Sequence, residues 1–462
     1  MSSFLFINGD FAFSSTSNTV NLVNNSDLSD AGTQAVSVIT IGGENLHGFV
    51  GVNGPYEFDS NGNGIIDDTD SPNANAMGFS FSDLNFALAL IKPDPTTILD
   101  QRDWYALSAN ASDIQLVGID NLVAHIHKLT VEINQGGGTK NALANSTVVN
   151  FSALPSGGLD VTTGPTGTIK LDFDSPLLRA SADIELAVGD FFFVNGTFGF
   201  EESTQNFTLS DGSPIAASVL SIGATGASAF LGVNGPYLQD SNLDGKIDSS
   251  DTPNAAASGL SLTGINFALV LIRPTSTGPP SAAVTDKRDW LALKAHADSA
   301  ELIGITGLTA SATDINISIN RGGGVNGVTP NDTVVNFSVL NGGGLSVPGT
   351  SLKLDFSGPL LEASATIELQ IFDFVYARGS IAIHRGAPET ITLSDNSTKL
   401  VQALTIGGDN ITLFAGLNGP DTNSAAVGLK ATGISFGVAL FKPTDLNDAS
   451  SYYAVKAHIG SL

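Results

Sequence analysis

Two twelve-residue segments carry oxygen-bearing side chains at a spacing that could bind a metal ion. They occupy residues 59–70 and 240–251, and each has oxygen donors at positions 1, 3, 5, 9 and 12, a glycine at position 6 and an isoleucine at position 8. Ca²⁺ binds about six to eight hard oxygen ligands, and a loop of this length and spacing supplies them. The chemistry that these segments predict is calcium binding.

The remaining loop positions fit the same interpretation. Position 7 would contribute a backbone carbonyl, the glycine permits a sharp turn, and the isoleucine would lie beneath the loop. The candidate ligands of the first loop are Asp59, Asn61, Asn63, Ile65 through its carbonyl, Asp67 and Asp70. Those of the second loop are Asp240, Asn242, Asp244, Lys246 through its carbonyl, Asp248 and Asp251. An acidic, glycine-rich surface turn that binds no ion is the alternative, and the agreement between two copies argues against it.

Both segments resemble the calcium loop of dockerin modules and of the wider EF-hand group. They depart from the EF-hand at position 12, where Asp70 and Asp251 replace the usual glutamate. The sequences that follow, Ser-Pro-Asn-Ala-Asn at 71–75 and Thr-Pro-Asn-Ala-Ala at 252–256, do not begin an amphipathic helix. The resemblance therefore implies a calcium loop without a helix–loop–helix pair, and neither a calcium sensor nor a cohesin-binding dockerin.

The loops belong to a large tandem repeat. Gly-Val-Asn-Gly-Pro-Tyr at 51–56 returns at 232–237, and Gly-Leu-Asn-Gly-Pro follows at 416–420, which gives steps of 181 residues (232 − 51) and 184 residues (416 − 232). Arg-Asp-Trp at 102–104 returns at 288–290, a step of 186 residues (288 − 102). A nearly constant period shared by unrelated motifs indicates duplication of one unit. We predict unit 1 at residues 1–190, unit 2 at 191–373 and a partial unit 3 at 374–462.

The third unit lacks the calcium loop. Asn-Ser-Ala-Ala-Val-Gly-Leu at 423–429 aligns with Asn-Ala-Ala-Ala-Ser-Gly-Leu at 254–260, while the flanking strand-like sequence continues. We therefore expect each loop to be an excursion, a segment that leaves the sheet and returns to it with its two ends adjacent. The fold is not expected to require it. Residues 4–13 parallel 191–200, and residues 453–458 parallel 291–296. We accordingly expect the chain to be a piece of a longer array.

The elements that must position the loops are strands. Period-2 alternation dominates, as in Thr-Asp-Ile-Asn-Ile-Ser-Ile-Asn at 313–320, and turn signals such as the glycine runs at 136–138 and 322–324 separate the segments. The 51 glycines and 19 prolines oppose long helices. The fold class is all-β. An elongated, β-solenoid-like tandem repeat is favoured over tandem β-sandwich domains, because strand-like sequence passes through residues 186–191 and 369–374 without a linker.

Composition limits the possible partners. Acidic residues outnumber basic ones by 45 to 19, for a formal charge of −26, which opposes nucleic acid and anionic membrane surfaces and suits a chain that binds cations. Charged residues make up only 14% of the 462, against roughly 25% in typical soluble proteins. There is no cysteine, so disulfides and thiolate metal sites are excluded. No apolar run is long enough for a transmembrane helix, and the start lacks the pattern of a signal peptide.

Other possible functional residues are weaker candidates. His125 and His127 are spaced like a metal pair, but they align with Ser311 and Thr313 of unit 2, so a metal role is not expected. Trp104 and Trp290 could form a glycan-stacking platform, although core packing is the favoured interpretation. No catalytic set repeats between units, and we expect that the chain is not an enzyme.

The pattern is similar to the repeat regions of very large bacterial extracellular proteins, including surface adhesins. This resemblance implies a structural segment at the cell surface or outside the cell, with calcium as its cofactor, that acts as a spacer or fibre in attachment. Neighbouring repeats of the same protein and cell-surface glycans are the possible macromolecular partners. The competing interpretation is a carbohydrate-binding or carbohydrate-active β-helix with Trp104 and Trp290 in a groove.

Overall fold

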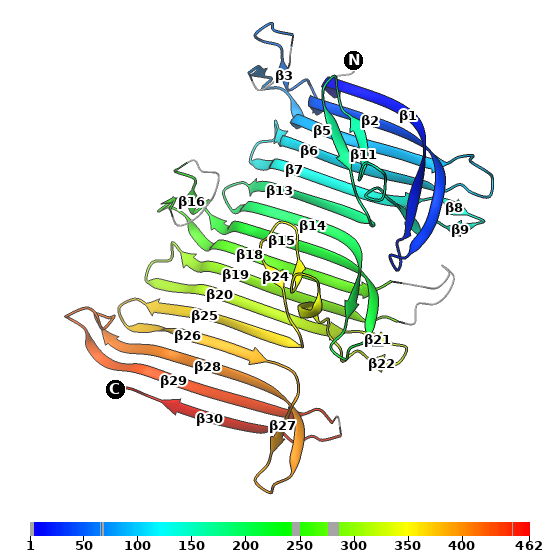
Figure 1. Cartoon of the computed structure of the whole chain (residues 1–462). Helices are drawn as coiled ribbons and strands as arrows, with labels where there is room; N and C mark the ends of the chain where they lie inside the picture. The colour runs from blue at the N-terminus through cyan, green and yellow to red at the C-terminus, as the bar shows by residue number, and fades with distance from the viewer. Residues whose placement is uncertain (1–3, 65, 67–68, 243–249, 276–285, 446) are drawn as a thin grey trace.

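The chain forms one broad antiparallel β-sheet. The computed structural model describes residues 4–64, 66, 69–242, 250–275, 286–445 and 447–462. The sheet has 18 strands, and apart from β10 and β27 they pair in chain order, each with the next long strand. The two ends of the chain lie at opposite ends of the sheet (Figure 1). The prediction of an all-β fold is confirmed.

Each complete unit contributes six long strands. Unit 1 supplies β1 (Leu5–Asn24), β2 (Asp30–Val52), β5 (Met77–Pro93), β6 (Asp103–Val117), β7 (Leu122–Gly137) and β13 (Leu177–Val188). Unit 2 supplies β14 (Phe192–Thr208), β15 (Pro214–Val233), β18 (Ser258–Pro274), β19 (Asp289–Ile303), β20 (Leu308–Gly323) and β25 (Leu360–Ile371). Unit 3 supplies β26 (Val375–Arg385), β28 (Thr398–Leu417), β29 (Val427–Pro443) and β30 (Tyr452–His458).

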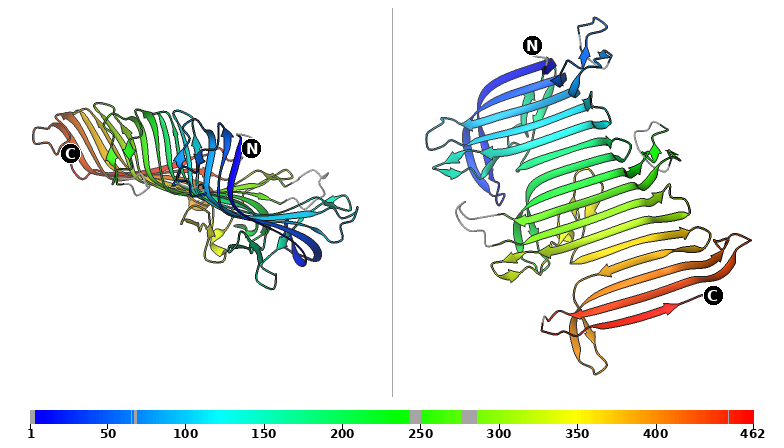
Figure 2. Two further views of the ribbon diagram at one scale, coloured as in Figure 1. Left: turned by 90° about the horizontal axis from the view of Figure 1, so that it is seen from above. Right: turned by 180° about the vertical axis from the view of Figure 1, so that it is seen from behind.

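The units join by ordinary strand pairing. β13 pairs with β14 from Leu177 opposite Ser203 to Val188 opposite Phe192, and β25 pairs in the same way with β26. The expected boundaries at 190/191 and 373/374 fall in the turns between these strands. The sheet consequently passes through both joins without a gap, which Figure 2 shows from above and from behind.

The winding of the chain differs from a solenoid. A solenoid coils, whereas every pairing here is antiparallel and the chain runs back and forth within one layer. The alternative of tandem sandwiches is wrong as well, because the long strands of all three units belong to the same sheet. Alternation of polar and apolar residues predicts strands but does not encode which strands pair, so the sequence could not distinguish these arrangements.

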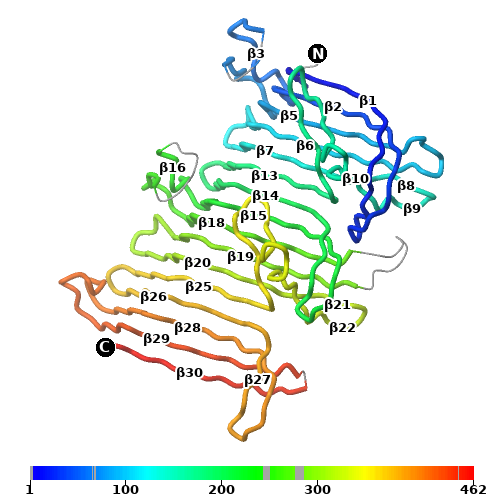
Figure 3. The backbone as a smooth tube through the Cα atoms, in the orientation of Figure 1, coloured from blue at the N-terminus to red at the C-terminus, as the bar shows by residue number. Residues whose placement is uncertain are grey.

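In the two complete units, a connection folds back over one face of the sheet. We call residues 138–176 cover segment 1 and residues 324–359 cover segment 2; they link β7 to β13 and β20 to β25. Cover segment 1 contains β8 (Thr139–Lys140), β9 (Leu143–Ala144), β10 (Thr147–Asn150), β11 (Leu159–Thr162) and β12 (Thr168–Leu171). Cover segment 2 contains β21 (Val325–Asn326), β22 (Thr329–Pro330), η1 (Phe337–Val339), β23 (Leu345–Ser346) and β24 (Lys353–Leu354). Figure 3 traces both across the sheet.

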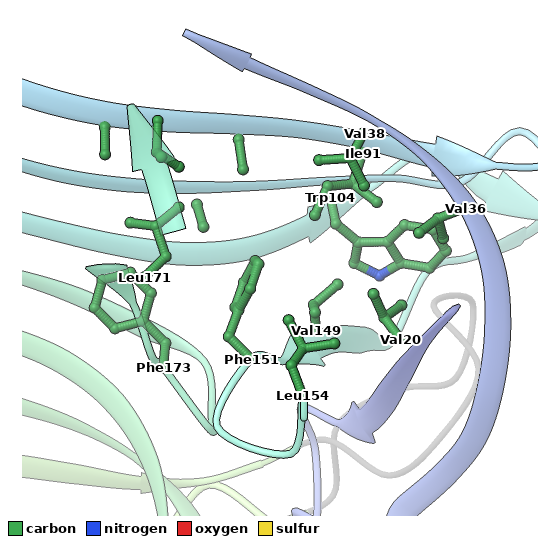
Figure 4. Packing of buried hydrophobic residues seen from close by; sticks show 14 of the residues in the cluster. Val20, Val36, Val38, Ile91, Trp104, Val149, Phe151, Leu154, Leu171 and Phe173 are labelled. Atoms are coloured by element: carbon green, nitrogen blue, oxygen red, sulfur yellow. The ribbon is translucent and has the colours of Figure 1, made fainter. Parts of the chain in front are cut away.

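The main hydrophobic cores lie beneath the cover segments. Under cover segment 1, Trp104 of β6 packs with sheet residues such as Val38 and Ile91 and with Phe151 and Leu171 of the cover (Figure 4). The equivalent residues of unit 2 form a second cluster around Trp290. Both indoles are almost completely buried, at 1% and 2% exposure. They therefore cannot form the glycan-stacking platform of the competing interpretation, and their predicted core role is confirmed.

Hydrogen bonds orient the buried indoles. Trp104 Nε1 donates to the carbonyl of Thr147 at 3.0 Å, and Trp290 Nε1 donates to the carbonyl of Thr333 at the same distance. Directly beside each indole, a glycine allows the cover backbone to approach the sheet. A Cβ atom at Gly136 would lie 2.1 Å from the Thr147 carbonyl oxygen, which no side chain tolerates. The glycine runs thus serve close packing as well as turning.

Helical structure is almost absent from the described residues. Only the single 3₁₀ turn η1 occurs there. No helix in this part of the chain has the length and apolarity required to cross a membrane.

Candidate calcium loops

The short strands that flank the two predicted loops lie on the same long side of the sheet (Figure 1). The first lies between β2 and β5 and is closed by the short hairpin of β3 (Glu57–Phe58) and β4 (Ser71–Pro72). The second lies between β15 and β18 and is closed by β16 (Leu238–Gln239) and β17 (Thr252–Pro253). The ends of each loop are therefore adjacent, as the sequence predicts.

The first loop wraps around the carboxylate at position 1. Asp59 Oδ1 accepts the backbone N–H of Asn63 at 3.0 Å, and Asp59 Oδ2 accepts that of Gly64 at 2.9 Å. Asn61 Oδ1 accepts the Asn63 N–H at 2.9 Å. These bonds bring the oxygens of positions 1 and 3 to the inner side of the same turn, where a cation bound by both would lie.

The carboxylate at position 12 binds the backbone at the start of the loop. Asp70 is buried, at 8% exposure, and its Oδ1 accepts the N–H groups of Ser60 and Asn61 at 2.9 and 3.4 Å. A carboxylate is costly to bury unless hydrogen bonds or a cation compensate its charge. An aspartate at this position therefore reaches the start of the loop, and the oxygen-only donor set fits Ca²⁺.

The second loop repeats this arrangement where it is described. Asp251 is 5% exposed, and its Oδ1 accepts the N–H of Ser241 at 3.0 Å. Asn242 Nδ2 donates to Ser250 Oγ at 3.1 Å, just as Asn61 Nδ2 donates to Thr69 Oγ1 at 3.0 Å. The candidate ligands Ile65, Asp67, Asp244, Lys246 and Asp248 lie outside the described residues. Asp240, at position 1, borders a pocket of about 240 Å³ between the excursion and the sheet.

In each excursion, an asparagine that the sequence analysis missed links the chain after the loop to the turn before it. Asn73 Nδ2 donates to the carbonyls of Asn53 and Pro55 at 2.9 and 3.0 Å. Asn254 makes the equivalent bonds to Asn234 and Pro236 at 2.8 and 3.2 Å. The signal was available, because an asparagine recurs at this place in each unit.

Unit 3 keeps the strands and omits the loop. β28 and β29 pair up to Leu417 opposite Val427, and the residues between them form a short turn in which the Asn423 N–H donates to the Pro420 carbonyl at 3.0 Å. The sheet therefore forms without the twelve-residue segment, as the sequence analysis expected.

The first excursion also covers part of the sheet face opposite the cover segment. Tyr56 packs against a small cluster made by Phe49, Ala76 and Val117. Burial raises the pKa of the Tyr56 hydroxyl, and the negative charges of Glu57 and Asp113 raise it further. Tyr56 thus remains a neutral phenol at physiological pH.

No protein-family model matches the chain, and no curated protein matches it. The functional argument therefore depends on the geometry described above.

Proposed function

We propose that this chain is a calcium-stabilised structural segment of a large extracellular bacterial protein, which acts as a spacer or fibre in surface attachment. The observation that carries the proposal is the continuous strand pairing from unit to unit, through β13–β14 and β25–β26. Separating two units at either join would break about a dozen residue pairs of the ladder at once. A segment built in this way transmits distance and force, which is what a spacer must do.

In this proposal, calcium stabilises the excursions of the two complete units. Each excursion connects the second and third strands of its unit, and the first packs back on the sheet face that the cover segment leaves bare. A cation that fixes the loop between Asp59 and Asp70 stabilises this packing by excluding open conformations. Loops of this ligand type in extracellular modules bind calcium with dissociation constants of about 10⁻⁴–10⁻³ M, which suits a location outside the cell.

Neighbouring repeats of the same protein are the partners that the surface supports best. On the face opposite the cover segments, apolar side chains alternate with the core positions and remain partly exposed. Examples on successive strands are Ile39, Leu90 and Tyr105 in unit 1 and Leu271 in unit 2. A glycan partner loses its main support, since both tryptophans are buried. The proposal includes no catalytic activity.

The calcium part of the proposal is tested by titrating metal-free protein with calcium in a calorimeter. We expect about two loop-type sites in the parent chain and none in the double variant Asp59→Ala/Asp240→Ala. The matched control is Asp395→Ala, because Asp395 accepts hydrogen bonds from Ser397 in an exposed turn of unit 3, outside both loops. Undiminished calcium binding by the double variant would refute the assignment of the loops.

The spacer part is tested by small-angle X-ray scattering in calcium. A single elongated particle with little movement between units is expected, because paired strands cross both joins. A scattering profile that requires several independently moving globular bodies would refute the spacer while leaving the calcium assignment intact.

A further inference from the structure

A second group of metal-binding side chains lies in unit 1, away from both loops. Asp113 of β6 is directly opposite His127 of β7, and His125 is opposite Gln115 on the same pair of strands. Directly paired residues of antiparallel strands point to the same face, and so do residues two apart. The three side chains therefore converge on the face that cover segment 1 leaves bare.

The three side chains meet at a single carboxylate oxygen. Asp113 Oδ1 lies 2.6 Å from His125 Nε2 and 2.9 Å from His127 Nδ1. The two imidazole rings are 3.8 Å apart between centroids. All three side chains are partly buried, with 25% to 42% of their surface exposed. The arrangement is open enough for an ion to enter and sheltered enough to hold it.

Unit 2 shows that the fold does not need this group. The equivalent residues are Ser299, Ser311 and Thr313, which also lie on adjacent paired strands, β19 and β20. Ser299 there makes an ordinary hydroxyl contact with Thr263 at 2.9 Å. The same sheet positions thus hold small hydroxyls in one unit and two imidazoles with a carboxylate in the other. A structural requirement would apply to both units, so the group in unit 1 calls for a different explanation.

We propose that Asp113, His125 and His127 form a binding site for a divalent transition-metal ion of the zinc class. Two imidazole nitrogens and one carboxylate oxygen are a ligand set that zinc prefers, whereas Ca²⁺ selects oxygens. Zinc–nitrogen bonds of about 2.0–2.1 Å place neighbouring ligand atoms about 3.3 Å apart in a tetrahedron. The three ligand atoms here lie within 4.8 Å of one another, so rotations of the side chains bring them onto one ion.

The neighbouring charges favour a cation at this place. Asp183 of β13 pairs with His127 on its other side. The Asp183 carboxylate accepts hydrogen bonds from Thr197 and Lys128. Lys128 lies 3.0 Å from Asp183 and compensates part of this charge. With three protein ligands, the ion would keep at least one position open to water.

The test is a titration of the full chain with Zn²⁺ in a calorimeter, in buffer containing excess calcium so that the loops are saturated. Co²⁺ provides a second readout, because visible absorption bands report nitrogen ligation and tetrahedral geometry. The main variant is Asp113→Ser/His125→Ser/His127→Thr, which introduces the residues of unit 2 and should therefore fold. We expect one zinc per parent chain, and at least about a 10-fold loss of affinity in the variant.

Two matched variants make the outcome specific. His296→Asn removes a histidine that contacts Asp298 at 3.0 Å but has no second histidine beside it, and unit 1 carries Asn110 at that place. This variant should keep the parent stoichiometry and cobalt spectrum. The loop variant Asp59→Ala/Asp240→Ala should also keep both. Absence of saturable zinc binding by the parent chain would overturn the proposal. Equal binding by the triple variant, or loss of zinc binding in the loop variant, would overturn it as well.

Discussion

A buried asparagine in each complete unit binds the cover segment to the sheet, and replacing it should weaken the attachment of that cover alone. Asn134 of β7 is fully buried, and its Nδ2 donates to the carbonyls of Val149 and Ser175, both at 2.9 Å. Asn320 of β20 makes the equivalent bonds to Val335 and Gly358, again at 2.9 Å. The substitution Asn134→Leu keeps the number and branching of the side-chain heavy atoms and removes both donors.

The expected change in the opening free energy of cover segment 1 follows from three contributions. Two lost hydrogen bonds cost about 1–3 kcal/mol together, and the buried carbonyl of Val149 left without this donor costs about 1–3 kcal/mol more. Against this, Asn134 Oδ1 is a buried acceptor without a partner in the described structure, and removing it returns about 1–3 kcal/mol. The last two contributions offset each other. The opening free energy of cover segment 1 should fall by about 1–3 kcal/mol.

Hydrogen exchange measured residue by residue is the appropriate assay. The amide of Phe151, which donates to the Phe173 carbonyl at 2.7 Å, reports cover segment 1, and the amide of Phe337, which donates to the Phe356 carbonyl at 2.8 Å, reports cover segment 2. A loss of 1–3 kcal/mol corresponds to exchange roughly 5- to 150-fold faster. Asn134→Leu should accelerate exchange at Phe151 only, and Asn320→Leu at Phe337 only.

Two results would refute this reasoning. Unchanged exchange at Phe151 in Asn134→Leu would show that the asparagine does not hold the cover. Acceleration at both reporters by either single substitution would show that the two cores open as one unit, although their residues form separate clusters.

Three further predictions concern the loops and acid stability. Asn73→Ala should weaken calcium binding by the first loop about 10-fold in calorimetry, because two hydrogen bonds at its foot are lost, and should leave the second loop unchanged. Chelation of calcium should lower the melting temperature, while the β signal in circular dichroism persists at moderate temperature, because unit 3 keeps its strands without a loop. Hydrogen bonds from Arg102 and Arg288 lower the pKa values of Asp100 and Asp286 below 3.8. These depressed values stabilise the fold above about pH 4, and the contribution is lost as the pH falls through the folded-state pKa. In the double variant Arg102→Gln/Arg288→Gln, the free energy of unfolding should therefore fall less steeply as the pH is lowered. Acid denaturation measures this dependence.

The repeat made part of the fold predictable. Period-2 alternation identified the strands, and the shortened third copy identified the loops as excursions, because both signals are local in the sequence. The single antiparallel sheet was not predictable in this way, since pairing of β13 with β14 is a choice among partners that all have the same alternation. The cover segments were missed because their strands, from 2 residues in Thr139–Lys140 to 4 in Thr147–Asn150, carry no long pattern.

The proposed metal site of unit 1 illustrates the same limit. His125 and His127 are close in sequence, and their alignment with Ser311 and Thr313 argued against a metal role. Asp113 belongs to the preceding strand, and only the register of β6 with β7 brings it to the histidines. Comparison between copies identifies what the fold requires. It cannot identify a property that one copy has gained.

The three copies also separate the residues that the fold needs from those that calcium needs. Phe49, Phe230 and Phe414 occupy one position in the three units and are all buried. The glycine of the following Asn-Gly-Pro turn packs on this ring, since a Cβ at Gly235 would lie 2.3 Å from Phe230 and one at Gly419 would lie 2.6 Å from Phe414. In units 2 and 3 the turn therefore packs on the buried ring, with a loop after it in unit 2 and without one in unit 3. The aspartates follow a turn that is already fixed, so a cation bound by them, as we propose, would stiffen a sheet that it does not have to fold.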